Sequence, residues 1–445
     1  MKKIVIIGGG ISGLSTAYFI LKKLKEKNET AEITLIEKNS TLGGNISTYS
    51  HNGFIIEGGP DCFISDKPSA INLCEELGLS DNLITTKEEN KGTFILNKGR
   101  LILLPEGLMF MVPTKITPFL SSPLISFPGK IRMGMDLFIP RRKDNSDESL
   151  GNFVRRRLGQ EALDKIAEPL IAGIHAGDPE KMSVKSTFPR FVDMEKKYRS
   201  LIRGMLAKKH HAAETKDHNS GKHKKTLFMS LKGGLIELPN KIRDKINPFT
   251  RIILNTKVLS INKIHISENE QKYEIKMNNN ETIIADNIIL TNPAYEAAKL
   301  IKDFAPILSS LLNDFSYTST ITISVGFNRS DIKHDLHGHG FIIPKTEKRK
   351  IMGTTWTSEK FPYRAPSGYV LLRGFIGELR NPEVIKLPEG QILEIILKEW
   401  HDIMGIEAKP VIHKTYHWNK VMPQYILGHE NTLSKMENMV ASHKG

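Results

Sequence analysis

Three glycines near the start of the chain have the spacing of a phosphate-binding turn. Gly8, Gly10 and Gly13 fit the pattern G-x-G-x-x-G within MKKIVIIGGGISGLSTAYFILKK (1–23). The first glycine permits a tight bend, the second lets the backbone approach a pyrophosphate, and the third lets a helix pack on a strand. The amides that begin this helix then face the negative charge. The intervening residues belong to the same candidate site: Gly9, Ile11 and Ser12.

An acidic residue follows at the distance expected of a ribose ligand. EITLIEKN (32–39) reads as a second strand, and Glu37 at its end comes 37 − 13 = 24 residues after Gly13. A carboxylate there suits a pair of ribose hydroxyls and rejects the extra phosphate of NADP. The alternative is a solvated glutamate at a strand end. We include Glu37 and its neighbour Lys38 among the candidate cofactor residues.

These side chains need a strand, a turn and a helix to position them. Residues 4–7 are apolar and β-branched, which is typical of a buried parallel strand. The following residues place Leu14, Ala17 and Leu21 near one face of a helix. The uncharged run 4–21 resembles a signal peptide or an anchor, but three glycines would damage either. No other stretch reads as long and apolar enough to span a bilayer.

The composition is that of an ordinary globular protein with excess positive charge. The chain has 445 residues, 39% of them hydrophobic and 25% charged, and its formal net charge is +14. This length suits two or three domains. The basic surplus could attract nucleic acid, an anionic membrane or a polycarboxylate substrate, or simply coat the surface. With only two cysteines, Cys62 and Cys74, we expect neither disulfides nor a metal site, and a reducing cytoplasm.

Two further glycine pairs follow the acidic strand. Gly43-Gly44-Asn45 comes first, and NGFIIEGGPDCF (52–63) then gives a strand followed by Gly58-Gly59-Pro60. Two ordinary turns are the alternative interpretation. The arrangement resembles the extended dinucleotide motif of two-domain flavoproteins, which implies FAD. That resemblance adds these residues to the candidate cofactor site: Gly43, Gly44, Asn45, Gly59, Pro60, Asp61 and Cys62.

Longer matches in the same order narrow the resemblance. SLGNFVRRRLGQEALDKIAEPLIAGIHAGDPEKMSVKSTFPRF (149–191), LKGGLIELPNKI (231–242), ADNIILTNPA (285–294) and VMPQYILGH (421–429) are similar to flavin-dependent porphyrinogen oxidases, within the amine oxidase and phytoene desaturase group. The resemblance implies oxidation of coproporphyrinogen III to coproporphyrin III with FAD and molecular oxygen, releasing hydrogen peroxide. The alternatives are protoporphyrinogen IX oxidation, another amine oxidase-like activity, and a non-catalytic remnant.

The same resemblance places further residues. Gly173 and Ile174 match a substrate-pocket turn over the flavin face, and Val258 matches a residue whose backbone lies near the adenine. Trp418 and Met422 would lie near the flavin ring. A helix break at Gly173 and a tryptophan in the core are the alternatives. We nominate no catalytic acid or base, because the hard chemistry belongs to the cofactor and the protein supplies orientation and a dry cavity.

Substrate choice depends on the number of propionates. The protoporphyrinogen branch of the family has an arginine just before the strand FILNKG, and here that place is Thr93. This departure favours the coproporphyrinogen branch, and so does the sequence LIAGIHAGDP. The net positive charge favours it as well, since a basic surface attracts a tetra-anion.

The expected fold is α/β: a two-domain FAD-linked oxidoreductase with a Rossmann-like nucleotide-binding domain, a mixed-sheet substrate domain and a helical subdomain. We expect residues 1–75, 228–300 and 415–445 in the FAD-binding domain, 76–105 and 301–414 in the substrate domain, and 106–227 in the helical subdomain. The substrate sheet should contain TFILNKGRLILLP (93–105), TITISVGF (320–327), GFIIP (340–344) and YVLLRGFIG (369–377). RIILNTKVLSI (251–261) should be a strand, and 208–226 a mobile, solvated loop.

Expectations about partners are less specific. The resemblance implies a cytoplasmic enzyme whose helical subdomain can contact the inner face of the cell membrane. Nucleic acid is not an expected partner, because no interleaved aromatics or binding fold accompany the basic residues. The oligomeric state stays open. The family pattern continues past MPQYxxGH into a strand and a glycine-rich turn at the flavin, whereas this sequence stops at MVASHKG, so we expect weakened FAD retention.

Overall fold

The N-terminal strand lies inside a four-stranded parallel sheet. In the computed structural model, which describes residues 1–89, 91–109, 111–214, 226–267, 271–443 and 445, the order of this sheet is β12-β2-β1-β16. Its strands are β1 (Lys2–Ile7), β2 (Ala31–Ile36), β12 (Thr250–Ile253) and β16 (Asn287–Leu290). Strand β1 pairs with neighbours on both sides, which explains its apolar run. The predicted strand–turn–helix start is confirmed, because helix α1 (Ile11–Lys27) follows directly.

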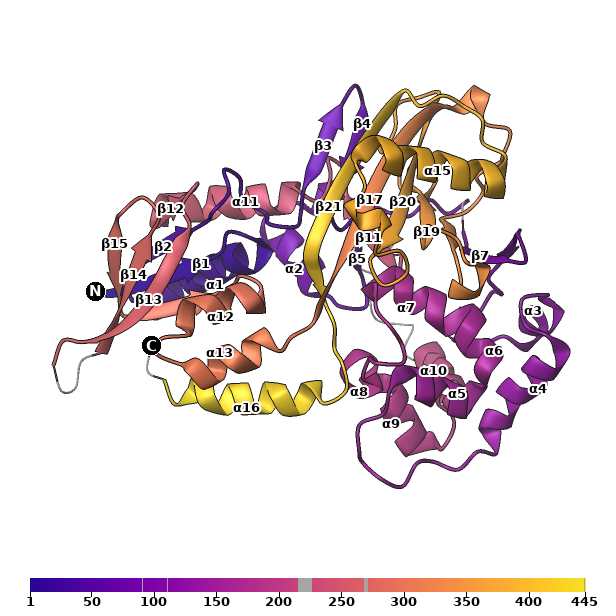
Figure 1. Cartoon of the computed structure of the whole chain (residues 1–445), viewed down its shortest axis with the longest axis horizontal. Helices are drawn as coiled ribbons and strands as arrows, with labels where there is room; N and C mark the ends of the chain where they lie inside the picture. Colours follow the sequence, from indigo (N-terminus) through magenta and orange to yellow (C-terminus); the bar gives the residue numbers. More distant parts are fainter. Residues whose placement is uncertain (90, 110, 215–225, 268–270, 444) are drawn as a thin grey trace.

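Helices pack on both faces of this sheet. One core contains the predicted inner faces of α1 and of the helix after Gly233-Gly234, namely Leu14, Ala17, Leu235, Leu238 and Ile242. The helices on the two faces are α2 (Ser69–Glu76), α11 (Glu237–Ile246), α12 (Ala294–Ile301), α13 (Pro306–Asn313) and α16 (His429–Ala441). In Figure 1 they surround β1 on the N-terminal side of the molecule.

The run 251–261 differs from the prediction. It forms two strands in two sheets: β12 pairs with β2, whereas β13 (Val258–His265) begins an antiparallel sheet with β14 (Gln271–Met277) and β15 (Thr282–Ala285). Asn255 between them has a φ of 52°, in the left-handed region that interrupts a strand. The alternation of apolar residues continues through this turn, so the sequence pattern gives no sign of a turn there.

A seven-stranded mixed sheet forms the second main layer, in the order β21-β17-β20-β19-β18-β7-β8. Its strands are β7 (Phe94–Asn97), β8 (Arg100–Leu103), β17 (Tyr317–Asn328), β18 (Gly340–Ile342), β19 (Gly353–Trp356), β20 (Tyr369–Gly377) and β21 (Ile412–Pro423). All four predicted segments lie in it. Strand β21 extends this sheet across the expected boundary at residue 415, by pairing with β17. Helix α15 (Glu389–Met404) packs Trp400 into the sheet's core.

The described part of residues 106–225 is mostly helical, as predicted, and lies below the seven-stranded sheet in Figure 1. Its helices are α3 (Ile116–Ser121), α4 (Phe127–Gly134), α5 (Leu150–Leu158), α6 (Gln160–Ala162), α7 (Glu168–His175), α8 (Val184–Thr187), α9 (Pro189–Tyr198) and α10 (Leu201–Glu214). Helix α10 occupies 208–214, where a loop was expected, and 215–225 lie outside the described residues.

Short strands complete the fold. Two hairpins are β3 (Thr48–His51) with β4 (Phe54–Glu57), and β9 (Leu108–Met109) with β10 (Val112–Pro113). A small sheet contains β5 (Phe63–Ile64), β11 (Phe228–Leu231) and β6 (Leu83–Thr85). Strand β11 therefore joins the chain after the helical layer to the segment that follows the third glycine turn.

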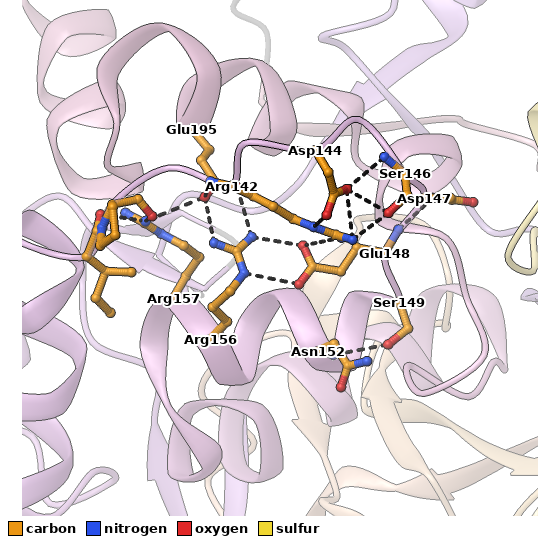
Figure 2. A network of polar contacts seen from close by, with 12 residues as sticks. Arg142, Asp144, Ser146, Asp147, Glu148, Ser149, Asn152, Arg156, Arg157 and Glu195 are labelled. Carbon is orange, nitrogen blue, oxygen red and sulfur yellow. Dashed lines mark hydrogen bonds and ion pairs between the residues drawn. The ribbon is translucent and has the colours of Figure 1, made fainter.

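Ion pairs hold the helical layer together, as Figure 2 shows. Arg156 of α5 contacts Glu148 at 2.8 Å and Glu195 at 2.6 Å between nitrogen and oxygen. Arg157 beside it is fully buried and pairs with Asp136. A cavity of about 450 Å³ adjoins this network. We read the network as structural, because these arginines already have carboxylate partners.

Candidate functional site

The first glycine turn leaves the N-terminus of α1 open. Gly10 caps the helix without a side-chain hydrogen bond, and the first turn contains no acidic residue. The intrahelical bonds begin with the amide of Leu14, which donates to the carbonyl of Gly10 at 3.0 Å, so the earlier amides remain available to an anion. A Cβ on Gly13 would lie 1.9 Å from the carbonyl oxygen of Gly8. The helix and the turn therefore contact each other through backbone atoms, with no room for a side chain at Gly13.

The second glycine pair packs on the first turn. The amide of Gly43 donates to the carbonyl of Gly9 at 2.9 Å, and a Cβ on Gly44 would lie 3.0 Å from the Cα of Gly10. The φ angles of Gly43 and Gly44 are 114° and 62°, which other residues rarely adopt. Conformation and space both require glycine here.

The third glycine turn, Gly58-Gly59-Pro60, lies between the second turn and the seven-stranded sheet. The amide of Gly58 donates to the carbonyl of Ser47 at 2.7 Å. A Cβ on Gly59 would lie 1.9 Å from the carbonyl oxygen of Asn45. Pro60 is exposed although Gly58, two residues before it, is buried, so the turn presents one side to open space. The three turns thus offer a continuous path of close-packed backbone, which fits a long dinucleotide.

Glu37 lies at the other end of this path. Its side chain is 6% exposed and accepts hydrogen bonds from the amides of Gly9 at 2.7 Å and Asn39 at 2.9 Å. Its backbone pairs with Ile253 of β12. Val258, at the start of β13, is buried, whereas Lys38 is exposed. The carboxylate is therefore fixed beside the first glycine turn, where a ribose would be bound.

Three side chains of the seven-stranded sheet hold the third turn. Thr322 of β17, Arg373 of β20 and Trp418 of β21 donate to the carbonyl oxygen of Gly58 at 2.7, 2.8 and 2.9 Å. Arg373 also donates to the carbonyl of Gly59 at 2.6 Å. The sequence analysis named Trp418 as a candidate near the flavin and did not name the other two. The available signal was the single charge of Arg373 within an otherwise apolar strand.

A buried charged cluster adjoins Pro60. The Lys360 Nζ lies 3.0 Å from a carboxylate oxygen of Asp61 and 3.4 Å from the Sγ of Cys62. Burial would raise the pKa of Asp61, but the cations of Lys360 and Arg373 outweigh it and hold that pKa well below its usual value. Burial, aided by the Asp61 charge, raises the pKa of the Cys62 thiol to about 12. Cys62 is therefore a protonated thiol and no nucleophile.

Gly173 and Ile174 lie within helix α7, not in the turn expected there. The turn comes later, at Ala176, whose φ is 46°. The reason is that Gly173 meets no steric demand for a bend: a Cβ on it would lie 3.6 Å from Ile342, in ordinary contact. Ile174 is 49% exposed, so its side chain faces open space.

The end of α7 is fixed to the large sheet. The side-chain amide of Gln424 donates to the carbonyl of His175 at 3.0 Å, and the hydroxyl of Thr318 donates to the carbonyl of Ala176 at 3.2 Å. Ala176 and Met422 belong to one apolar cluster. A cavity of about 420 Å³ lies between α7 and the ends of β19 and β20, with Met352 and Arg380 in its lining.

The fold and the site together define a flavin-dependent oxidoreductase. Residues 11–443 match the family described as flavin containing amine oxidoreductase, and the chain belongs to this family. It is 36% identical to coproporphyrinogen III oxidase of Bacillus subtilis over 99% of this chain and 91% of that protein. It is 30% identical to the coproporphyrinogen III oxidase of Staphylococcus aureus, over 98% and 91% of the two chains. Protoporphyrinogen oxidase 2 of Arabidopsis thaliana is 27% identical over 98% and 87%.

Solved structures agree with this assignment. The crystal structure of a protein from Exiguobacterium sp. 255-15, provisionally called a protoporphyrinogen oxidase, superposes with a TM-score of 0.83 at 28% identity, covering 99% of this chain and 91% of that one. Reduced UDP-galactopyranose mutase shares the fold, with a TM-score of 0.70 at 17% identity over 99% and 88%. The predicted fold class, family and FAD cofactor are confirmed. The individual site residues stay predictions. Among the described residues, no helix is both long and apolar enough to cross a membrane.

Proposed function

We propose that this chain oxidises coproporphyrinogen III to coproporphyrin III with FAD and molecular oxygen. The row of three glycine turns, ending at the anchored Gly58–Pro60 turn, carries the proposal. Full-length similarity to coproporphyrinogen III oxidases supports the substrate. When bound, FAD accepts a hydride in each of three two-electron steps and passes the electrons to oxygen, so six electrons reduce three oxygen molecules to hydrogen peroxide.

The residues of the chain bind and orient the reactants. The open amides of α1 hold the pyrophosphate, and Glu37 holds the ribose. Gly44, Asn45, Gly59 and Pro60 approach the flavin ring, with Asp61, Cys62 and Trp418 behind them and the Val258 backbone near the adenine. Gly173 and Ile174 border the substrate, where the absence of a side chain on Gly173 permits a flat macrocycle to approach. Hydride transfer then depends on closeness and on exclusion of water.

Charge supports the tetracarboxylate substrate. The net charge of +14 attracts four propionates more strongly than two. The position before β7, occupied by an arginine in the protoporphyrinogen branch, is Thr93. The test is aerobic incubation of the FAD-loaded protein with coproporphyrinogen III and, separately, protoporphyrinogen IX, following porphyrin fluorescence and peroxide. We expect a kcat/KM about tenfold or more in favour of coproporphyrinogen. Equal rates, or oxidation of neither substrate, would contradict the proposal.

We also infer that the enzyme contacts an anionic membrane surface on the cytoplasmic side. Helices α3 and α4 and the turn after them expose large apolar side chains on the outer edge of the helical layer: Ile116, Leu120, Phe127, Ile131, Met135 and Phe138. Phe127 is 72% and Phe138 82% exposed. Exposed Lys115 and Lys143 flank these residues. Apolar insertion beside basic residues favours an anionic lipid interface.

Vesicle co-sedimentation tests this contact. The variant Phe127→Ser with Phe138→Ser should bind vesicles rich in phosphatidylglycerol about tenfold more weakly than the unaltered chain. Phe249→Ser is the matched control, because Phe249 is 69% exposed elsewhere on the molecule. Equal vesicle binding by all three proteins would contradict the inference.

A further inference from the structure

Arg373 is a buried cation whose partners are main-chain carbonyls. Its side chain is 2% exposed, and no described carboxylate oxygen lies within 4.0 Å of its nitrogens. One terminal nitrogen donates to the carbonyls of Gly58 and Gly59, at 2.8 and 2.6 Å. Its Nε has no hydrogen-bond partner among the described residues. The carboxylates of Asp61 and Glu57 act on this cation only from a greater distance, so its close contacts are backbone carbonyls. Burying a charge without an ion pair is unfavourable, so this arrangement is typical of a functional requirement.

The three donors on Gly58 fix the direction of one peptide group. Thr322, Arg373 and Trp418 approach the Gly58 oxygen from adjacent strands of the sheet. The Gly58–Gly59 peptide is trans, so the amide N–H of Gly59 points opposite to that oxygen, away from the sheet. No acceptor for this amide exists among the described residues. The next residue, Pro60, is exposed, so open space adjoins this turn.

We propose that Arg373 is a positioning residue for the flavin: it sets the Gly58–Gly59 peptide so that the Gly59 amide donates to an acceptor atom of the flavin ring. The inference rests on the proposed function, because it requires FAD bound along the three glycine turns. The guanidinium at the carbonyl end polarises this peptide and strengthens the N–H as a donor. Its charge also favours the more electron-rich, reduced ring over the oxidised one.

Arg364 provides a matched control. It is 0% exposed, and its nitrogens donate to the carbonyls of Leu231 at 3.0 Å and Lys232 at 3.2 Å and to Ser230. Its Nε also lacks a partner among the described residues. The two arginines thus share burial and chemistry, and only Arg373 contacts the glycine turn.

The test compares Arg373→Met, Arg373→Lys and Arg364→Met by titrating the apoprotein with oxidised and, separately, with reduced FAD, recording the visible spectrum of bound flavin, and measuring the melting temperature without flavin. Arg373→Met should raise the Kd for FAD about tenfold or more, shift the bound-flavin spectrum, and reduce the preference for reduced over oxidised FAD. Arg373→Lys should recover part of each effect. Arg364→Met should lower the melting temperature while changing the Kd less than about threefold.

Equal increases in Kd for Arg373→Met and Arg364→Met, or an unchanged spectrum and Kd for Arg373→Met, would overturn the inference. If Arg373→Met does not fold, Arg373→Lys and Thr322→Val decide, since Thr322→Val removes one donor from the same carbonyl. A raised Kd and a shifted spectrum in both support the inference, and unchanged values in both overturn it. A wild-type chain that binds FAD but oxidises no porphyrinogen would refute the proposed function and leave this inference standing.

Discussion

Trp418 donates its indole N–H to the carbonyl oxygen of Gly58 at 2.9 Å, although the two residues are 360 positions apart in the chain. This bond ties the last strand of the seven-stranded sheet to the third glycine turn. Tyr416, two residues earlier on β21, stacks on the indole with ring centroids 6.0 Å apart. The end of the cofactor path is thus held by the sheet that faces the helical layer.

Trp418→Phe should weaken FAD binding in addition to lowering the stability of the chain. The phenylalanine keeps an aromatic ring but loses the bond to Gly58, which should lower the free energy of unfolding by about 1 kcal/mol. Trp400→Phe is the control, because Trp400 loses an equivalent 2.7 Å bond to Thr354 in the sheet core. FAD titration and urea unfolding of both variants check this. We expect the larger loss of stability for Trp400→Phe, because Trp400 is fully buried, and a raised Kd only for Trp418→Phe; the same Kd in both would contradict it.

Gly59→Ala should abolish tight FAD binding. The added Cβ would overlap the carbonyl oxygen of Asn45, which belongs to backbone and cannot move aside cheaply. Gly390→Ala is the control, since nothing lies within 4 Å of a Cβ there and the residue lies in the first turn of helix α15. Calorimetric titration should show at least about a hundredfold loss of FAD affinity for Gly59→Ala. Gly390→Ala should bind normally and melt at the same or a slightly higher temperature.

Glu37→Gln should raise the Kd for FAD about tenfold. The carboxylate accepts two backbone amides through its two oxygens, whereas a glutamine has only one acceptor oxygen and would also bind ribose hydroxyls less strongly. Glu26→Gln, on the exposed side of α1, serves as the control. Flavin fluorescence titration measures both. An unchanged Kd for Glu37→Gln would show that this carboxylate supports the turn without binding the cofactor.

Stability should fall as the pH is lowered below 6.5, partly through His339. Burial, with the charge of nearby Lys360, lowers the pKa of His339 from 6.5 to about 4. Between these values the unfolded chain binds a proton that the folded chain excludes. The penalty is therefore absent above pH 6.5 and complete below about pH 4, amounting to about 3 kcal/mol.

His339→Asn should remove the part of this dependence that comes from His339, whereas His337→Asn, exposed in the same loop, should retain it. Urea unfolding at several pH values between 4 and 7 gives the slope of the free energy of unfolding for each protein. The difference between the two variants should approach one proton at the middle of this range. Identical slopes would mean that the pKa of His339 is the same in the folded and the unfolded chain.

Local patterns in the sequence were sufficient for the nucleotide end of the site. The strand before Gly8, the helix after Gly13 and the acidic strand end at Glu37 are adjacent in the chain, so spacing alone places them. The two further glycine pairs were recognised by their resemblance to the extended dinucleotide motif of flavoproteins. Their stacking, through the Gly43–Gly9 and Gly58–Ser47 backbone bonds, could not be read from spacing.

The opposite end of the site depends on contacts between distant residues. Thr322 and Arg373 meet Gly58 only because β17 and β20 are adjacent in the folded sheet, and nothing near Gly58 in the sequence indicates this. The turn at Asn255 was missed because its flanking strands share one apolar alternation. Gly173 was expected in a turn, but the helix continues through it and the turn comes at the left-handed residue Ala176.

Equilibrium titration of the whole chain with FAD and, separately, with FMN tests most directly whether the three glycine turns bind FAD. FMN carries the same ring without the adenine nucleotide, so it lacks the pyrophosphate and the adenosine ribose that α1 and Glu37 are placed to bind. We expect one FAD per chain, bound about a hundredfold or more tightly than FMN. FMN binding as tightly as FAD, or no FAD binding at all, would contradict the central claim.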